Sequence, residues 1–312
     1  VFDGKLNQDI THKSGLDLNQ QIATLDGELS NVLSFIQDEP NVQIVNTAQK
    51  HYVKQVTNSD PDFAGLPILS ASSPFQLEQS TNQFFYLNAG EIDLNQALQL
   101  YPYDNKLVVL KINSQNIKEW LECSASFFEQ IDAESHQPQT LTNQPQFPAY
   151  HFDIIDGINY QIDVSQPARY NAQCQLINPT ADRIVNAHFK EKPLERNQWY
   201  LLATNNYRAY GGNFPGTGKN AVVIDSPYDN RLIVADYMQR LNTSKGSIHF
   251  SVDNNWSLKP IESKHPLDIR FRAPKNKLAT EFIQRHSHYP MILLESEEKE
   301  WNEYRIQLIH NL

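Results

Sequence analysis

Apolar residues recur along this chain at two different spacings, and segments of the two kinds alternate. Spacing of three to four residues predicts helices at 25–36, 40–56, 94–100, 114–128, 232–241 and 278–286. Short apolar or alternating runs predict strands at 66–71, 106–112, 151–164, 184–189, 199–203, 267–272, 291–294 and 304–309. Interleaved helices and strands of this kind indicate an α/β or α+β fold.

Individual residues set several of these boundaries. Pro40 opens a helix whose apolar stripe is Val42, Val45, Ala48, Tyr52 and Val56. Asp93 and Ser114 are predicted to cap the helices that follow them. The segment 132–148 is rich in Gln, Asn, Ser and Pro, and we expect a long surface loop there.

The loop after the strand at 199–203 carries the most chemistry in the chain. It holds rings (Tyr207, Tyr210, Phe214), directional donors (Asn205, Asn206, Arg208) and glycines (Gly211, Gly212, Gly216, Gly218). Glycines let the backbone turn sharply and let a flat ligand approach it closely. Loops at strand ends often carry binding groups. From the residues alone, the loop is either a ligand-binding loop or a structural turn whose rings fold inward.

Composition and charge narrow the class of partner. The chain has 312 residues and a formal net charge of −10, with no basic run. Binding to nucleic-acid polymers depends on Lys and Arg contacts to phosphates, so we do not expect such a partner. A small nucleotide needs only a local positive group and stays possible. No stretch approaches the roughly 18 apolar residues of a membrane span, so no membrane partner is expected either.

No recognisable catalytic centre is found in the sequence. His286 and His288 form the one His-x-His pattern, after a predicted surface helix, and we do not assign metal ligands to it. Asp153, Asp156 and Asp163 alternate with apolar residues on predicted strands. We interpret these carboxylates as solvated faces or turns and not as an acid/base pair. No metal ligands are therefore assigned in this chain.

Several long motifs resemble one known family. They are Phe152-Asp-Ile-Ile-Asp-Gly-Ile-Asn-Tyr-Gln-Ile-Asp163, Gln166-Pro-Ala-Arg-Tyr170, Glu119-Trp-Leu-Glu-Cys-Ser-Ala125 and the loop at 199–218. From about Val42 to the C-terminus, the chain resembles the C-terminal domain of the 5′-nucleotidase family, in its cyclic-nucleotide phosphodiesterase/3′-nucleotidase branch. The loop at 70–75 departs from the Gly-rich, Arg-containing loop of 5′-nucleotidases. That departure favours the branch, which has small residues with Pro-Phe there.

The resemblance implies an architecture. It implies an α+β fold, a four-layer α/β/β/α sandwich, in which residues 41–312 form the nucleoside-binding domain. Residues 1–40 resemble the connector between the family's two domains, and an extension of this branch begins at about 260. The N-terminus has no signal-peptide pattern, so we expect any signal to lie upstream or to have been removed.

The resemblance also implies a binding site. It points to Tyr103 and Tyr207 as two rings that sandwich a base, with Tyr150 and Phe214 as substitutes. Asn205, Asn206 and Arg208 would reach base edges, ribose or phosphate, and Gly211 and Gly212 would shape the loop. The alternative for Tyr103 is a core tyrosine that ends a helix.

The function implied is that of a specificity domain in a periplasmic phosphoric ester hydrolase. Its partners would be nucleosides, 3′-nucleotides, 2′,3′-cyclic nucleotides and a covalently linked metallophosphoesterase domain. That second domain would hold the divalent metal pair, because the Asp and His motifs of such a centre are absent here. We therefore expect the present chain alone to be inactive. The alternative is a stand-alone, non-enzymatic module that binds nucleosides or sugars.

Cys123 and Cys174 are the two cysteines of the chain. In a reducing compartment they would be two unrelated buried thiols. In the periplasmic location that the resemblance implies, they could form a disulfide bond.

Overall fold

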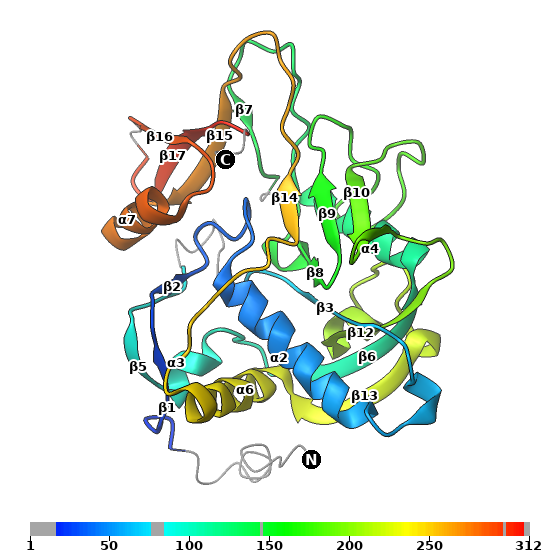
Figure 1. Ribbon diagram of the computed structural model, residues 1–312. Helices are drawn as coiled ribbons and strands as arrows, with labels where there is room; N and C mark the ends of the chain where they lie inside the picture. Colours follow the sequence, from blue (N-terminus) through cyan, green and yellow to red (C-terminus); the bar gives the residue numbers. More distant parts are fainter. Residues whose placement is uncertain (1–16, 76–83, 144–145, 296–297, 309–312) are drawn as a thin grey trace.

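The largest sheet among the described residues has five strands, and we call it the central sheet (Figure 1). The computed structural model describes residues 17–75, 84–143, 146–295 and 298–308. The strands of the central sheet are, in spatial order, β13 (Val222–Asp229), β6 (Lys106–Asn113), β12 (Trp199–Asn205), β3 (Ile68–Ser72) and β8 (Ile154–Asp156). Strand β12 runs parallel to β3 and antiparallel to β6.

Both faces of the central sheet are buried, which explains the continuous apolar runs of β6 and β12. Leu107 and Val109 point into one core and Val108 and Leu110 into the other, because successive side chains of a strand alternate. The first core is covered by α2 (Pro40–Thr57), α3 (Leu94–Leu98) and α6 (Asn230–Lys245). The second is covered by α4 (Ser114–Ser124).

A smaller sheet shares the second core with α4. Its order is β11 (Lys192–Pro193), β10 (Ile184–Phe189), β9 (Asn159–Ile162) and β14 (Trp256–Leu258). Tyr160 and Trp256 pack from this sheet against the same core as Trp120 of α4. Mixed sheets with helices segregated around them make an α+β fold, and the expected class is confirmed.

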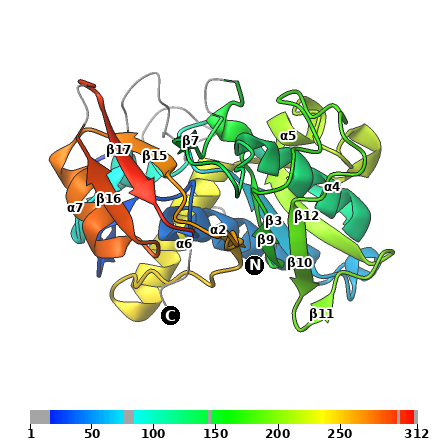
Figure 2. The same cartoon turned by 90° about the horizontal axis from the view of Figure 1, so that it is seen from above.

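A third sheet, formed mainly by the C-terminal part of the chain, lies at one end of the molecule (Figures 1 and 2). Its order is β16 (Met291–Leu294), β17 (Trp301–Ile306), β15 (Ile269–Pro274) and β7 (Gln139–Thr140), with α7 (Lys277–His286) beside it. Strand β7 comes from the segment 132–148, which was expected to be a surface loop. That segment is in part structural, because Leu141 and Phe147 are fully buried in the second core.

Residues 17–39 are packed into the domain. Strand β1 (Gln21–Leu25) pairs with β5 (Gly90–Asp93), and β2 (Leu29–Ser30) pairs with β4 (Tyr86–Leu87). The helix predicted at 25–36 is therefore wrong, although its apolar residues are buried. Asn31 explains the difference, because its side chain donates to the Phe75 carbonyl and accepts from the Phe85 N–H. Residues 1–16 of the expected connector lie outside the described residues.

The signals for the observed helices agree with the structure, except for the cap of α4 and the exposure of Val56. Asp93 caps α3 by a reciprocal capping box with Gln96, as predicted. Helix α4 is capped by Asn113, whose side chain accepts from the Asn116 N–H, and not by Ser114. Val56 is exposed, unlike the rest of its stripe, because it lies in the last turn of α2, before the largely exposed segment 58–65.

Candidate binding site

A pocket of about 230 Å³ opens at one end of the central sheet. The residues that line it are Phe75, Tyr103, Asn105, Tyr150, Tyr207 and Arg208. They come from four segments that meet there: the ends of the parallel strands β3 and β12, the start of the antiparallel strand β6, and the turn before β8. The strand register explains this meeting, because Asn205 pairs with Leu107, and Ser72 with Ile154.

Three tyrosine rings give the pocket its character. Tyr103, Tyr150 and Tyr207 are 40%, 38% and 38% exposed, in contrast to the buried tyrosines of the core. Phe75 is buried next to Tyr103, with ring centroids 5.5 Å apart at 74°. Tyr150 and Tyr207 meet edge to face at 6.2 Å. Tyr103 is therefore not a core residue, and it lines the same pocket as Tyr207.

The two adjacent amides of the loop build the short helix α5 (Asn206–Tyr210). Asn205 caps α5, since its Oδ1 accepts from the Arg208 N–H at 2.9 Å, and its Nδ2 donates to the Tyr101 hydroxyl at 2.6 Å. Asn206 accepts from the Lys106 N–H through its Oδ1 at 2.9 Å. These bonds hold the helix that carries Tyr207 in place, and a contact of the two amides with a base or ribose stays a prediction.

Arg208 lies buried at the pocket wall, and two of its three guanidinium nitrogens bond other parts of the protein. Its Nε donates to both Asp153 carboxylate oxygens, at 2.7 and 2.9 Å. Its Nη2 donates to the Ser73 hydroxyl and to the Tyr150 carbonyl, both at 2.9 Å. These charge-assisted bonds give Arg208 an internal role, and its contact with a base, ribose or phosphate stays a prediction. Arg208 instead fixes the segment that carries Tyr150.

The carboxylates interpreted as solvated are in fact buried. Asp153 pairs with Arg208 and also accepts from the Trp120 indole N–H at 3.0 Å. Asp156 pairs with Lys50, and Asp163 with Lys259, each at 2.7 Å. Alternation with apolar residues did not reveal this, because the pairing cations lie far away in sequence. A buried carboxylate with such a partner avoids the cost of an isolated buried charge.

Phe214 does not line the pocket. Its ring is buried and stacks on Trp120 of α4, with centroids 4.8 Å apart at 15°. Gly212 is required by that packing, because a Cβ there would lie 2.7 Å from the Phe214 ring. Gly211 follows α5, and its N–H bonds to the Tyr207 carbonyl. Of the two substitute stacking residues, Tyr150 lines the pocket and Phe214 does not.

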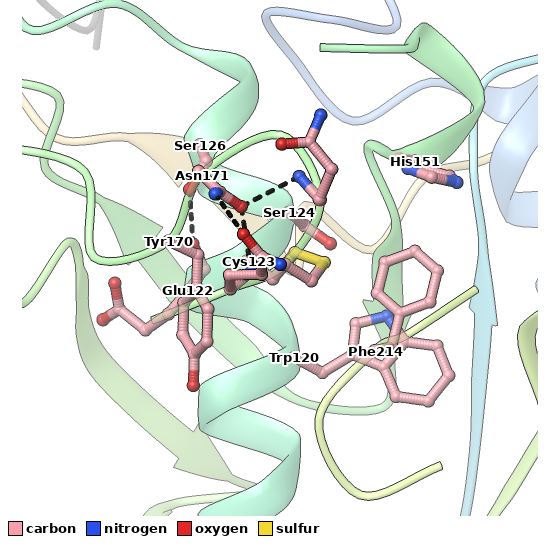
Figure 3. The surroundings of a disulfide bond; sticks show 12 residues. Trp120, Glu122, Cys123, Ser124, Ser126, His151, Tyr170, Asn171 and Phe214 are labelled. Carbon is pink, nitrogen blue, oxygen red and sulfur yellow. Dashed lines mark hydrogen bonds between the residues drawn. A yellow bond between two sulfur atoms is a disulfide. The ribbon is translucent and has the colours of Figure 1, made fainter. Parts of the chain in front are cut away.

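A disulfide bond joins Cys123 of α4 to Cys174 (Figure 3). Their Cα atoms are 5.4 Å apart. Trp120, one turn earlier in α4, carries the Phe214 stack and the bond to Asp153. Next to Cys123, the Ser124 hydroxyl accepts from the Asp153 N–H at 3.3 Å. The disulfide thus lies on the helix that supports the Asp153–Arg208 pair.

Comparison with known proteins finds a family that matches the part of the chain containing the pocket. A family model described as 5′-nucleotidase, C-terminal domain, matches residues 21–216. The chain belongs to the 5′-nucleotidase C-terminal domain family. The match includes every residue that lines the pocket, and it ends before the third sheet's three C-terminal strands.

Relatives of this chain include longer curated proteins. A protein of Salmonella typhimurium named 2′,3′-cyclic-nucleotide 2′-phosphodiesterase/3′-nucleotidase is 48% identical over 262 residues, which are 83% of this chain and 40% of that protein. A Yersinia enterocolitica protein of the same name is 43% identical over 294 residues, which are 93% of this chain and 45% of that one. The chain thus spans less than half the length of these relatives.

Solved structures of low sequence identity share the fold. A putative 5′-nucleotidase from Staphylococcus aureus aligns with a TM-score of 0.56 at 18% identity, over 83% of this chain and 44% of that one. A 5′-nucleotidase precursor from Thermus thermophilus aligns with a TM-score of 0.55 at 15% identity, over 83% and 42%. At these identities the likeness concerns the fold alone.

Sequence reasoning missed several residues of this family member's pocket. Phe75, Asn105 and His151 lie in or next to the pocket. The Pro-Phe sequence of the loop at 70–75 was noted as a family feature and not as a pocket wall, and no pattern distinguished Asn105 or His151. Asp153 was considered, but its role depends on Arg208, 55 residues away. Within the described ranges, no group of three His, Cys, Asp or Glu residues is arranged to hold a metal ion. In the same ranges, no helix has the length and apolar character needed to cross a membrane.

Proposed function

We propose that this chain is the nucleoside-binding domain of a 2′,3′-cyclic-nucleotide 2′-phosphodiesterase/3′-nucleotidase. The observation that carries the proposal is the pair Tyr103 and Tyr207, two partly exposed rings that line one pocket. Stacking on an aromatic ring contributes roughly 1–3 kcal/mol per base and tolerates any base. A pocket of about 230 Å³ takes part of a nucleoside, with the remainder outside.

The charges around the pocket favour the uncharged part of a nucleotide. Arg208 is the one cationic side chain among the described lining residues, and Asp153 already neutralises it. A phosphate therefore gains no unpaired positive partner there. The base and ribose would be gripped by this domain while the phosphate points out, towards a second domain.

The chemistry of the whole protein is part of the same proposal. It would hydrolyse 2′,3′-cyclic nucleotides to 3′-nucleotides, and these to nucleosides and phosphate. A divalent metal pair would supply the activated water. The described residues of this chain do not fit such a pair, because no suitable ligand group is present among them. We place the metal pair in a covalently linked phosphoesterase domain of the parent protein.

A periplasmic location is also proposed. Disulfide bonds persist in oxidising compartments, and Cys123 and Cys174 are joined here. The role in nucleotide catabolism follows from the proposed reaction.

The proposed division of labour is tested with the purified chain. Titration calorimetry with adenosine and 3′-AMP should detect binding, and 2′,3′-cyclic AMP and 3′-AMP should not be hydrolysed, with or without Mn²⁺ or Zn²⁺. Metal-dependent turnover that persists through further purification would contradict the placement of the metals elsewhere. Absence of adenosine binding would contradict the nucleoside site itself.

A further inference from the structure

His151 contacts the stacking residue Tyr207 directly. Its Nε2 lies 2.7 Å from the Tyr207 hydroxyl, and the two rings are 28° from parallel with centroids 5.9 Å apart. His151 follows Tyr150, which also lines the pocket and packs edge-on against both rings. The imidazole therefore fixes both the hydroxyl end and the tilt of the Tyr207 ring.

The other ring nitrogen of His151 lies in an apolar setting. Nδ1 is buried and has no hydrogen-bond partner among the described residues. The rings of Phe147 and Phe214 face the imidazole edge-on, at 6.1 and 5.4 Å. Figure 3 shows His151 near Phe214 in the surroundings of the disulfide.

The charged and titratable groups around His151 oppose one another. Burial lowers the pKa of His151, the Asp153 carboxylate raises it, and the Arg208 guanidinium lowers it. Among the described residues, Tyr207 and Tyr150 are the other titratable groups in contact with the imidazole. Asp153 and Arg208 neutralise each other as an ion pair, so burial decides and the imidazole is neutral at pH 7.

We propose that His151 is the positioning residue of Tyr207: neutral, it holds the ring in the orientation that stacks on a base, and its protonation releases the ring and weakens nucleoside binding. This rests on the proposed function of the pocket. The physical reason is that protonation makes both ring nitrogens donors, while the buried Nδ1 has no described acceptor. The imidazolium must turn towards water, and the bond to Tyr207 is then lost.

The test is the affinity for adenosine, measured by calorimetry between pH 5 and 8. The wild-type chain should bind more weakly as the pH falls, with a midpoint below the ordinary histidine value of 6.5. His151→Ala should bind about 2- to 10-fold more weakly at pH 7.5, the effect of one hydrogen bond, and should lose the pH dependence. His151→Gln, which can still bond the Tyr207 hydroxyl, should recover affinity without the pH dependence.

Two further variants complete the comparison. Tyr207→Phe should remove the pH dependence in the same way, and His151→Ala combined with Tyr207→Phe should bind no more weakly than the weaker single variant. His188→Ala is the control, because His188 lies on β10, outside the residues lining the pocket. Its affinity and pH profile should match those of the wild type.

The possible failures are distinguishable. If wild type binds adenosine and His151→Ala has the same affinity and pH profile, the positioning role is wrong. If wild type binds no nucleoside at any pH, the proposed function is wrong, and ligand-free NMR titration then decides the role of His151. The His151 ring should titrate differently in wild type and in Tyr207→Phe; identical titration overturns the inference. Melting temperatures identify any variant that fails to fold. In that case the pH dependence of adenosine binding by the wild-type chain still tests the inference.

Discussion

Tyr207 and Arg208 are neighbours in α5, and their side chains have opposite tasks. Tyr207 faces the pocket with its ring partly exposed, whereas Arg208 is buried against Asp153. Asn205 is buried like Arg208, and both its amide oxygen and its amide nitrogen bond other groups of the protein. At this scale the polar side chains of the loop build the site, and the rings are left for the ligand.

Two replacements of Tyr207 should distinguish the contribution of its ring to binding from that of its hydroxyl. Tyr207→Ala should weaken adenosine binding by roughly 1–3 kcal/mol, because the stacking face is lost. Tyr207→Phe keeps that face and should cost less at pH 7.5. Calorimetry measures both, with Tyr210→Ala as the matched control, since Tyr210 is exposed on the same helix and bonds Asp225. Equal losses for Tyr207→Ala and Tyr210→Ala would argue against stacking.

Breaking the Asp153–Arg208 pair should destabilise the fold. Asp153→Asn leaves the buried guanidinium uncompensated, and we expect a loss of about 3–5 kcal/mol in unfolding free energy. The control is Lys277→Met, which removes the exposed partner of Glu281 and should cost about 0–1 kcal/mol. Urea denaturation measures both. A loss for Asp153→Asn as small as the control would mean that the pair does not hold the pocket wall.

At the scale of elements, the pocket results from strand direction. The parallel strands β3 and β12 end at the edge of the sheet where the antiparallel strand β6 begins. The loops at these strand ends therefore meet, although they are far apart in sequence. Helix α4 supports this end of the sheet, because its residues Trp120 and Ser124 bond Asp153. The disulfide ties the same helix to the segment around Cys174.

Cys123 and Cys174 should be joined in protein made under oxidising conditions. The bond closes a loop with a sequence separation of 51, which stabilises by about 4 kcal/mol in the chain-entropy model. Thiol titration of the unfolded, unreduced protein should find no free thiol, and reduction should lower the urea midpoint. Two reactive thiols before reduction would refute the bond.

The sequence pattern predicted the elements in which apolar residues recur at regular spacing. It failed where a side chain, and not the backbone of a helix, satisfies backbone hydrogen bonds. Strands β10 and β16 and the helices α2 and α7 were predicted almost to the residue, because each has an apolar period and a clear boundary. The segment 25–36 has helical spacing, yet Asn31 bonds two distant backbone groups and folds it as turns. The pocket residues Tyr103 and Tyr207 came from a family resemblance. The Pro-Phe sequence at 74–75 identified a family branch but not the pocket wall, and no local pattern indicated His151.

For the whole molecule, the third sheet is fastened to the N-terminal segment. Glu28 accepts from Arg285 at 2.8 Å and contacts His286 at 2.6 Å, and Gln37 bonds the backbone of His286 and His288. Glu39, close to this junction, is fully buried with Gln37 as its hydrogen-bond partner. The junction therefore contains a carboxyl group with little compensation for its charge.

The stability of the molecule should fall as the pH rises towards 8. Burial raises the pKa of Glu39 from 4.5 to about 8, against the opposing bond from Gln37. The folded state thus binds more protons than the unfolded state between about pH 4.5 and 8, so unfolding free energy decreases across that window. Glu39→Gln should flatten this part of the melting-temperature profile. An unchanged slope in the variant would show that Glu39 does not carry the effect.

The central claim is that Tyr103 and Tyr207 grip the base of a nucleoside. A crystal structure of the chain soaked with adenosine tests it most directly. The account predicts the adenine ring in the pocket at the end of the central sheet, in stacking contact with Tyr103 on one face and Tyr207 on the other, with the ribose directed outward. Adenine bound in another cavity, or in contact with neither ring, would contradict it.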